Sequence, residues 1–457
     1  MPLQKNQVLT LRVERLSSDG SGVAHSPDGE TVFIPGAAPG DEARVRIVKD
    51  CKRYAFGILD EVLTPSPDRI PVDCAVAGPC GGCSLRHLDY AAELRAKQEN
   101  VADAFARIGG LDVPVLPIVG SPEVNRYRNK VQFPVGVDKS GKPCIGFYAG
   151  RTHRIVPCPD CRLQPGVLNE IGNALCAFFA EKGIQPYSEE TGRGLVRHIF
   201  LRRGAHSGQI MVCLVCTRAK LPSAEELCTR LKAQFAEITT ILLNVNAKNT
   251  NVILGTETHT LYGPGYIEDT LCGVPVQLGP LSFYQVNTLA AEQLYGIAAQ
   301  YAQLTPDDLL LDLYCGMGTI GLSMAAHCRE LIGVEIVPEA IESARANAAR
   351  MGADVAAKSR FFCADAGQAA TRLAAEGLHP DIVMLDPPRK GCDEATLSAV
   401  VRMAPRRVVY VSCNPATAAR DAAWLEKNGY HAEKVQPVDL FPRTKHVECV
   451  IVLSKGE

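Results

Sequence analysis

The stretch LLLDLYCGMGTIGLSMAAHC (residues 309–328) is an apolar run that passes through a glycine-rich turn into helical sequence, and it decides the fold of the C-terminal third. Four further short apolar runs follow, each with helical sequence behind it: ELIGVE (330–335), RFFCAD (360–365), DIVMLD (381–386) and RVVYVSC (407–413). Alternating strands and helices predict a mostly parallel, doubly wound α/β sheet. Such a sheet binds its ligands at the carboxyl ends of its strands, so polar residues there are the candidate site residues.

The turn after the first of these strands predicts a nucleoside site. Tyr314, Gly316 and Gly318 stand where the strand becomes a helix, and glycines let the backbone pass close to a ligand. Glu335 ends the next strand, where a carboxylate can accept hydrogen bonds from the hydroxyls of a ribose. The turn is one glycine short of the dinucleotide fingerprint and the sequence has no GxxxxGKS or GxxxxGKT motif, so S-adenosylmethionine fits better than NAD or ATP. Asp365 closes the third strand and predicts either an adenine contact or a helix N-cap.

Three residues at the remaining strand ends predict reaction chemistry. Asp386 precedes two prolines, which make a stiff turn that fixes the carboxylate in place. Cys413 ends the fifth strand, where a thiolate would be a strong soft nucleophile. Glu448 opens the last strand and becomes a candidate general base when it is paired with a nucleophile. Each also has an ordinary structural interpretation, as a proline turn, an inert thiol and a solvated charge.

The chain is long enough for several domains, with 457 residues of which 46% are hydrophobic and 21% charged. Short alternating strands over residues 1–62, with turns at SDGSG (18–22), SPDG (26–29) and APGD (38–41), predict a small closed barrel of the OB type. A proline-rich linker (63–71) follows, then a mixed α+β central domain (72–275) and the doubly wound domain (276–457). Within the central domain, YAAELRAKQENVADAFARIGG (90–110) has helical composition and stops at a glycine pair, so it predicts a helix. No apolar run approaches the ~20 residues of a membrane span and the N-terminus is polar, so we expect a cytoplasmic protein with no membrane contact.

A formal net charge of −2 excludes a uniformly basic surface, so any contact with nucleic acid must come from local patches. Four basic stretches, some with aromatic residues, lie outside the C-terminal domain: KDCKRYAFG (49–57), NRYRNK (125–130), GRTHR (150–154) and LRRG (201–204). One such stretch alone is usually a solvated face, but the four together predict a divided RNA-binding surface.

The 18 cysteines include one group with metal-ligand spacing. Cys74, Cys80 and Cys83 are spaced as C-x5-C-x2-C, and Cys158 and Cys161 follow far downstream. Two different sets of these cysteines could bind a metal. Cys80, Cys83, Cys158 and Cys161 would form paired C-x2-C knuckles that suit zinc, whereas the first three cysteines with one later cysteine would suit a 4Fe–4S cluster. Most of the other cysteines stand in apolar runs and are expected to be small core residues.

Five motifs together resemble the RNA 5-methyluridine methyltransferases. They are SFYQVN (282–287), DLYCGMGT (312–319), LDPPRKG (385–391), SCNPAT (412–417) and FPRTKHVE (441–448), in the order typical of that family. The sequence GSGVAHSPDGETVFIPGAAPGDEARVRI (20–47) also resembles the TRAM domain that members carry. The resemblance covers nearly the full length. It implies a Rossmann-like class I methyltransferase domain preceded by a TRAM barrel and the mixed central domain.

The resemblance also implies a role for each motif residue. The Cys413 thiolate would add to uracil C6, C5 would take the methyl group of S-adenosylmethionine, and Glu448 would remove the C5 proton so that the cysteine is expelled. Asp386 would act near both the methyl donor and the uracil. The residues implied to bind the cofactor are Gln285, Tyr314, Gly316, Glu335, Asp365 and Asp386, and those implied to bind the uracil are Phe283 and Gln285. The target base must leave its stack to reach such a site.

Members of the family that act on ribosomal RNA resemble this chain in their cysteine pattern, which implies a 4Fe–4S cluster. Its implied ligands are Cys74, Cys80, Cys83 and Cys161. The TRAM-like sequence and the cysteines together imply 23S rRNA as the RNA partner, with tRNA as the alternative and no obligate protein partner. The chain departs from the pattern at Arg443, where the family often has His, and at Thr319, where some members have Asn.

Two other activities compete with this interpretation. A methyltransferase for exocyclic base amines would need no nucleophile, and its acid–Pro–Pro–aromatic motif is broken here by Arg389. A non-catalytic RNA-binding protein with a structural metal would not need Cys413 at all. The complete set of strand-end residues argues against both.

Overall fold

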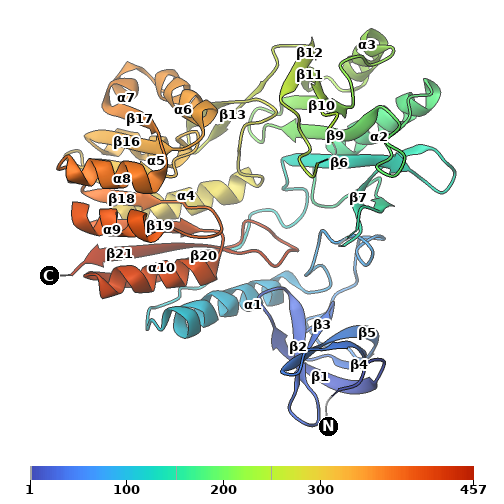
Figure 1. Ribbon diagram of the computed structural model, residues 1–457, viewed down its shortest axis with the longest axis horizontal. Coiled ribbons are helices and arrows are strands. Elements are labelled where there is room, and N and C mark those ends of the chain that lie inside the picture. The colour runs from blue at the N-terminus through green and yellow to red at the C-terminus, as the bar shows by residue number, and fades with distance from the viewer. Residues whose placement is uncertain (1–2, 151, 249, 457) are drawn as a thin grey trace. The chain divides into compact units, whose positions relative to one another are not determined.

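The computed structural model describes residues 3–150, 152–248 and 250–456 (Figure 1). The chain divides into two compact units. Unit 1 contains Met1–Val124, Pro388–Cys392 and Tyr410–Glu457, and unit 2 contains Asn125–Pro387 and Asp393–Val409. The chain thus passes between the units several times, once within the strand β19 (Arg407–Ser412).

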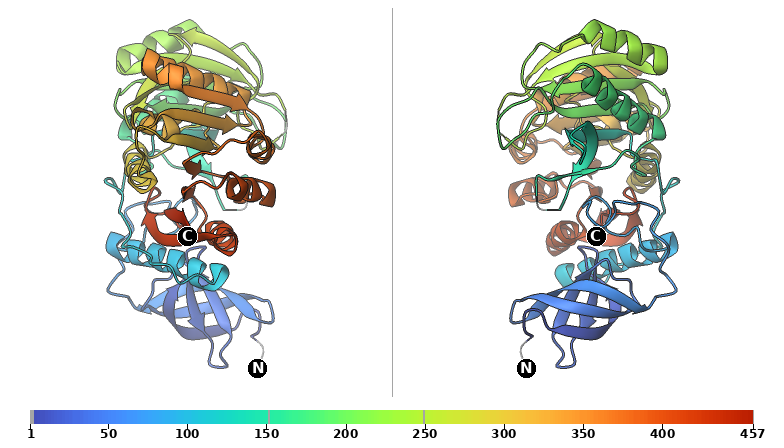
Figure 2. Two further views of the ribbon diagram at one scale, coloured as in Figure 1. Left: turned by 90° about the vertical axis from the view of Figure 1, so that its left-hand side faces the viewer. Right: turned by 90° about the vertical axis from the view of Figure 1, so that its right-hand side faces the viewer.

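Unit 1 begins with a closed five-stranded barrel in the order β1-β2-β3-β5-β4, and its strands wrap around one axis in both views of Figure 2. The strands are β1 (Val8–Leu16), β2 (Ser21–His25), β3 (Thr31–Pro35), β4 (Glu42–Asp50) and β5 (Tyr54–Thr64). Alternate residues point inward, so Val32 and Ile34 of β3 and Val45 and Ile47 of β4 are 0% exposed. A Cβ on Gly57 would lie 2.3 Å from the Val45 side chain, which explains a glycine within a strand. The predicted barrel is confirmed.

The strand β2 was not expected, because Ser21 and Gly22 belong to a sequence that predicts a turn. The backbone is extended there and pairs with β1 on one side and β3 on the other. A Cβ on Gly22 would lie 2.9 Å from both Ala37 and Val13, so this glycine permits close packing rather than a turn.

The rest of unit 1 combines segments from both ends of the chain. They are α1 (Tyr90–Asp103), the π-helix η1 (Ala104–Gly109), the end of β19, α10 (Pro415–Lys427), β20 (Tyr430–Val438) and β21 (Glu448–Lys455). The helix predicted after residue 89 is confirmed: Asp89 caps its start and Gly110, with φ +64°, ends it. The strands β20 and β21 are antiparallel, with Val438 opposite Glu448.

Unit 2 begins with a seven-stranded sheet in the order β12-β11-β10-β9-β6-β7-β8. Its strands are β6 (Lys130–Val137), β7 (Pro143–Tyr148), β8 (Ile155–Pro157), β9 (Val196–Arg203), β10 (Ile210–Cys216), β11 (Ile238–Val245) and β12 (Glu257–Tyr262), with helices α2 (Gly166–Glu181) and α3 (Ala224–Gln234). Strand β10 is buried along its whole length, including Cys213 and Cys216 at 0% exposure. The mixed α+β region is therefore confirmed, and these cysteines are core residues as expected.

The second part of unit 2 contains the parallel strands β17-β16-β15-β18 and the start of β19. The strands are β15 (Leu309–Leu313), β16 (Glu330–Glu335), β17 (Ser359–Cys363) and β18 (Ile382–Leu385), after a hairpin of β13 (Ile267–Leu271) and β14 (Val274–Leu278). The helices are α4 (Thr288–Ala302), α5 (Thr319–Met324), the short η2 (Ala325–His327), α6 (Pro338–Arg350), α7 (Ala353–Lys358), α8 (Ala366–Ala375) and α9 (Glu394–Met403). Leu311 of β15 pairs with Ile332 and Val383 in parallel register. This arrangement confirms the predicted α/β fold.

Within residues 3–150, 152–248 and 250–456, no helix has the length and apolar character needed to cross a membrane.

Candidate active site

The glycine-rich turn of unit 2 follows β15 in a conformation that few residues adopt. Tyr314, Gly316 and Gly318 have φ values of +66°, +55° and +80°. A left-handed tyrosine costs about 1–2 kcal/mol, and such strain is common at functional sites. A Cβ on Gly318 would lie 3.1–3.3 Å from neighbouring side chains, whereas a Cβ on Gly316 would meet nothing within 4 Å. The turn is therefore packed at Gly318 and open at Gly316, as a ligand cradle requires.

Glu335 ends β16 beside this turn. Its Oε2 accepts the Gly316 N–H at 3.2 Å, and its Oε1 accepts the N–H groups of Ile336 and Val337 at 2.8 and 3.0 Å. Each carboxylate oxygen has further lone pairs that can accept ribose hydroxyls. Asp365 accepts the Gln368 N–H at 3.1 Å and so is the N-cap of α8, which is one of its two predicted roles. Its contact with adenine stays a prediction.

Three carboxyl groups lie close together at the ends of β15, β16 and β18. Burial raises the pKa of Asp386 to about 7. Burial, together with the charges of Asp386 and Glu335, raises the pKa of Asp312 to about 8, although its Oδ2 accepts the Gly321 N–H at 3.0 Å. Carboxylates held this close repel one another, so a bound cation would relieve the repulsion.

Tyr295 on α4 belongs to the same site, although the sequence analysis missed it. It is 3% exposed, and burial, with a contribution from the Asp386 charge, raises its pKa. Its hydroxyl forms hydrogen bonds with the side chains of Gln285 and Thr319. It therefore links two predicted site residues.

The backbone in and next to the SFYQVN segment is held by side chains of unit 2, whereas one of its own side chains is exposed. Arg202 donates from Nη1 to Gly279 O and from Nη2 to Ser282 O, both at 2.7 Å, and Asn129 Nδ2 donates to Gln285 O at 2.8 Å. Phe283, by contrast, is 75% exposed. A large aromatic side chain presented to solvent by a rigid loop suits contact with a flat base.

Arg202 corrects one sequence expectation. It belongs to the LRRG stretch that predicted an RNA contact, but it is 1% exposed and binds backbone carbonyls. Arg126 of the NRYRNK stretch likewise donates to Cys161 O at 2.9 Å and pairs with Asp160. In the GRTHR stretch, Arg151 lies outside the described residues. These two arginines hold loops of unit 2 rather than form an open basic face.

Unit 1 holds the candidate nucleophile and base. Cys413 follows β19 and is half-buried, two residues before α10 begins, where a helix N-terminus favours negative charge. Glu448 is 5% exposed at the start of β21. Burial, together with the charges of Glu448 and Cys413, raises the pKa of the Cys449 thiol, and these charge effects imply that both residues lie near it. Cys413 and Glu448 are thus both near Cys449, and their catalytic roles stay a prediction.

The segment Pro388–Cys392 is attached to α10 through its backbone. Asn414 Nδ2 donates to Arg389 O at 2.9 Å, and Arg420 Nη2 donates to Lys390 O at 3.0 Å. Gly391 has φ +78°, and a Cβ there would lie 2.5 Å from the Asp421 carboxylate. These contacts fix the turn that follows Asp386.

Comparison with known proteins decides the family. The model of the tRNA (uracil-5-)-methyltransferases matches residues 206–456, more than half of the chain, and the TRAM domain model matches residues 2–59. The chain belongs to the RNA uracil-C5 methyltransferase family. It is an S-adenosylmethionine-dependent RNA (uracil-5-)-methyltransferase with an N-terminal TRAM domain.

Similar proteins cover the enzyme from end to end. An uncharacterised RNA methyltransferase of Halalkalibacterium halodurans is 43% identical over 454 residues, which is 99% of this chain and 98% of that protein. One from Bacillus cereus is 41% identical over 457 residues, 100% of this chain and 98% of that protein. The crystal structure of Pyrococcus abyssi tRNA (uracil-54, C5)-methyltransferase with S-adenosyl-L-homocysteine has a TM-score of 0.77 and 27% identity, and covers 98% of this chain and 100% of that one.

The cysteines proposed as metal ligands lie in both units of the methyltransferase. Cys74, Cys80 and Cys83 are half-buried in unit 1, and Cys83 contacts Arg86. Cys161 is half-buried and Cys158 is 3% exposed, both in unit 2. Among the residues that the structure describes, no group of three or more His, Cys, Asp or Glu side chains could hold a metal ion. The described geometry therefore gives no support to a bound cluster.

Proposed function

We propose that this methyltransferase modifies C5 of uridine through a covalent bond between Cys413 Sγ and uracil C6, with Glu448 as the base. The thiolate adds to C6, and the electron pair released to C5 would attack the methyl group of bound S-adenosylmethionine, whose S–CH3 bond would break to leave S-adenosylhomocysteine. Glu448 then accepts the C5 proton, the C5–C6 double bond forms again, and the C6–S bond breaks to return the thiolate. The observation that supports this proposal is that the charges of Cys413 and Glu448 both act on the Cys449 thiol, so both side chains lie near one residue of unit 1.

The proposed cofactor residues lie in unit 2, in and around the glycine-rich turn. Gly316 leaves room for the backbone to approach the cofactor, Glu335 accepts the ribose hydroxyls, and Asp386 faces the sulfonium charge. The remaining residues proposed here are Tyr314 and Asp365 for the cofactor, Gln285 for cofactor and uracil, and Phe283 for the uracil. The clustering of carboxyl groups supports a cationic ligand, because a sulfonium is stabilised by nearby negative charge.

We propose ribosomal RNA as the first candidate substrate, because the cysteine spacing of this chain resembles that of family members that act on rRNA. Transfer RNA is the second candidate, since the solved structure that covers 98% of this chain is described as a tRNA (uracil-54, C5)-methyltransferase. Because that alignment includes nearly all of this chain, the N-terminal barrel does not favour one RNA over the other. The cysteines are then the sole remaining argument for rRNA.

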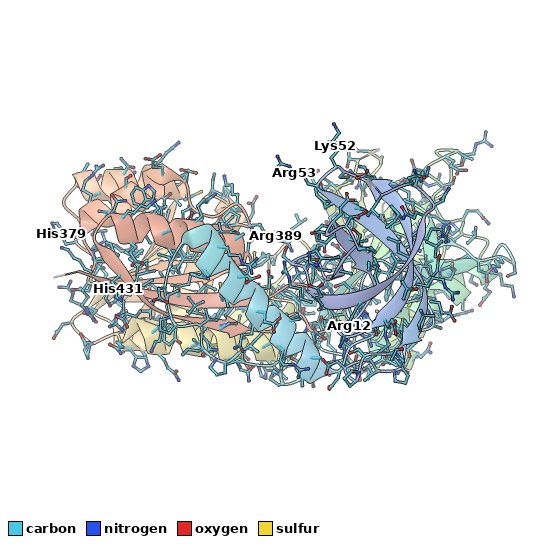
Figure 3. The ribbon with its side chains drawn as sticks, turned by 90° about the horizontal axis from the view of Figure 1, so that it is seen from below. Arg12, Lys52, Arg53, His379, Arg389 and His431 are labelled. Atoms are coloured by element: carbon cyan, nitrogen blue, oxygen red, sulfur yellow. The ribbon has the colours of Figure 1, made fainter. Side chains whose placement is uncertain are left out.

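The barrel offers a surface for unpaired RNA. Phe33, Tyr54 and Phe56 form an aromatic cluster on its outer face, with ring centroids 5.7–5.8 Å apart. Lys52 and Arg53 are exposed in the adjacent β4–β5 turn, and Figure 3 shows both side chains pointing away from the barrel. Aromatic rings that stack on bases, next to cations that attract phosphates, are typical of single-strand binding. We propose this aromatic and basic patch as the part of the predicted RNA surface that the barrel supplies.

Two further assignments rest on sequence. The division into residues 1–62, 72–275 and 276–457 predicts that limited proteolysis cuts near the two junctions. The 4Fe–4S cluster rests on cysteine spacing, with zinc as the alternative. Protein purified without oxygen should absorb near 400 nm and contain about four iron atoms per chain. That signal should be lost in Cys80→Ser and kept in Cys144→Ser, whereas zinc without the absorbance band would contradict the cluster.

Product analysis tests the proposed activity. The enzyme is incubated with methyl-labelled S-adenosylmethionine and, separately, with unmodified 23S rRNA and tRNA transcripts, and the RNA is digested to nucleosides. The expected product is labelled 5-methyluridine from one of the two RNAs. Label in a base amine would instead support the amine-methylating alternative, and labelling of tRNA alone would overturn the rRNA proposal.

A further inference from the structure

The loop of residues 439–447 joins β20 to β21 and ends directly before Glu448. Its first half is held by helix α1 of the same unit. Lys97 Nζ donates to Asp439 Oδ1 at 2.8 Å and to Phe441 O at 3.1 Å, and a third bond of 2.7 Å joins it to Glu93 Oε1. The Tyr90 hydroxyl donates to the other Asp439 oxygen at 2.9 Å.

The middle of the loop is held by the same helix. Glu93 Oε1 also accepts the backbone N–H of Arg443 at 2.7 Å. Arg443 has φ +70°, and its Nη1 donates to Leu88 O at 2.8 Å while its own carbonyl accepts the Leu85 N–H at 3.1 Å. A left-handed arginine is held in this conformation by bonds at its amide, its carbonyl and its guanidinium.

The charged groups of this network are removed from water. The side chains of Glu93 and Asp439 are 0% exposed, and that of Lys97 is 2% exposed. Moving charges out of water costs free energy, and proteins in which apolar side chains of similar volume replace a buried ion pair are often equally or more stable. A buried ion network is therefore weak evidence for a gain in stability. Its best-supported benefit is a single fixed geometry. The segment fixed here is the one that leads into the proposed base.

We infer that Lys97 and Glu93 are positioning residues, which hold the loop so that the Glu448 carboxylate stays where it can take the C5 proton. This inference rests on the proposed function of Glu448. Bond formation by Cys413 and methyl transfer precede proton removal and do not require Glu448 as base. Loosening the loop therefore slows the last step, in which Glu448 accepts the proton and the C6–S bond breaks. Enzyme joined covalently to methylated RNA then accumulates.

The test uses ordinary uridine RNA, S-adenosylmethionine and a denaturing gel that separates free enzyme from enzyme bound to RNA. Lys97→Met and Glu93→Gln should each raise the bound fraction at least tenfold over wild type, while the methyl group transferred in the first turnover stays within about twofold. Arg95→Met is the matched control, because Arg95 is on the same helix but 58% exposed and pairs with Asp68. It should behave as wild type.

A second variant keeps the inference testable if Lys97→Met does not fold. Tyr90→Phe removes one hydroxyl from Asp439 and should give a smaller accumulation of the same adduct. Folded variants with wild-type turnover and no adduct would overturn the inference and leave the network as an anchor of α1. Glu448→Gln separates this failure from that of the proposed function: if it too accumulates no adduct, the role of Glu448 is wrong, whereas adduct in Glu448→Gln alone rejects only the positioning role.

Discussion

The Tyr410 hydroxyl donates a 2.6 Å hydrogen bond to Asp421 Oδ2, and the same oxygen accepts the Cys392 N–H at 2.8 Å. One buried carboxylate on α10 thereby ties the end of β19 to the segment that follows the Asp-Pro-Pro turn. A carboxylate that loses one of these donors cannot replace it with water, because Asp421 is 1% exposed.

Tyr410→Phe should therefore lower the free energy of unfolding by about 1–2 kcal/mol, the usual cost of a lost hydrogen bond to a buried charge. Urea denaturation measures this change. Tyr266→Phe, at a half-buried tyrosine of unit 2, is the matched control and should change stability by less than about 0.5 kcal/mol. Equal stability of both variants would contradict a structural role for the Tyr410–Asp421 bond.

Asp386→Asn should separate stability from function. Burial raises the pKa of Asp386 from 3.8 to about 7, so the folded state holds the proton more tightly than the unfolded chain. Asp386 then lowers the free energy of unfolding progressively as pH rises from 3.8 to about 7. At pH 8 the wild type carries a negative charge on Asp386 that the variant lacks, so the variant without cofactor should be more stable by about 1–2 kcal/mol. The difference is smaller than the whole pKa shift would give, because Asp386 is only half-buried and solvent screens its charge. Below pH 3.8, where the carboxyl group is protonated in both the folded and the unfolded chain, the two should unfold alike.

The same ionisation predicts how cofactor affinity depends on pH. A protonated Asp386 cannot stabilise a sulfonium, so affinity for S-adenosylmethionine should rise as pH rises through about 7 and then level off. Titration calorimetry from pH 5.5 to 8.5 measures this dependence. Asp386→Asn should bind weakly and with a flat profile. Affinity of the wild type that falls over this range would contradict the proposed contact.

Phe283→Ala should damage activity without damaging the fold. Phe283 is 75% exposed, so its removal opens no cavity and the melting temperature should stay within about 1 °C. Loss of a stacking contact is worth about 1–3 kcal/mol, which corresponds to a fall in kcat/KM for RNA of about 5- to 150-fold. Leu281→Ala, two residues earlier and 66% exposed, is the control. An equal effect of both variants would show a loop effect rather than stacking.

Lys52→Ala with Arg53→Ala should weaken RNA binding most at low salt. Each phosphate contact contributes about 0.7 to the slope of log K against log salt for single strands, so the double variant should lose about 1.4 from that slope. Binding assays between 50 and 300 mM salt measure it. Arg44→Ala is the control, because Arg44 is on the same barrel but paired with Glu61 at 2.7 Å. An unchanged slope in the double variant would place the RNA elsewhere.

The predicted elements that the structure confirms are those with strong periodicity. The runs that became β15, β16, β17, β18 and β19 are short, apolar and followed by helices, so their parallel arrangement follows from the chain alone. The strand β2 was missed because Gly20 and Gly22 resemble turn residues, and only the packing against Ala37 explains the second of them. Local sequence does not report contacts with distant residues.

The same limit applies to the site. Glu335 and Asp386 were found because they end strands, where position alone suggests a ligand. Tyr295 lies within an apolar helix and shows its role only through its partners Gln285 and Thr319. The basic sequence around Arg202 predicts an RNA contact, because local sequence does not show that the carbonyls of Gly279 and Ser282 fold around this cation and bury it. The network of Glu93, Lys97 and Asp439 joins residues more than 300 positions apart, and nothing in the local sequence indicates it.

Covalent trapping tests the central claim most directly. The enzyme and S-adenosylmethionine are mixed with 5-fluorouridine-substituted rRNA and, in parallel, with substituted tRNA, because fluorine at C5 cannot leave as a proton does. The account predicts a band of enzyme joined to methylated RNA that survives denaturation, persists in Cys144→Ala and disappears in Cys413→Ala. No band with either RNA from protein that binds the cofactor, or a band that persists in Cys413→Ala, would contradict the account.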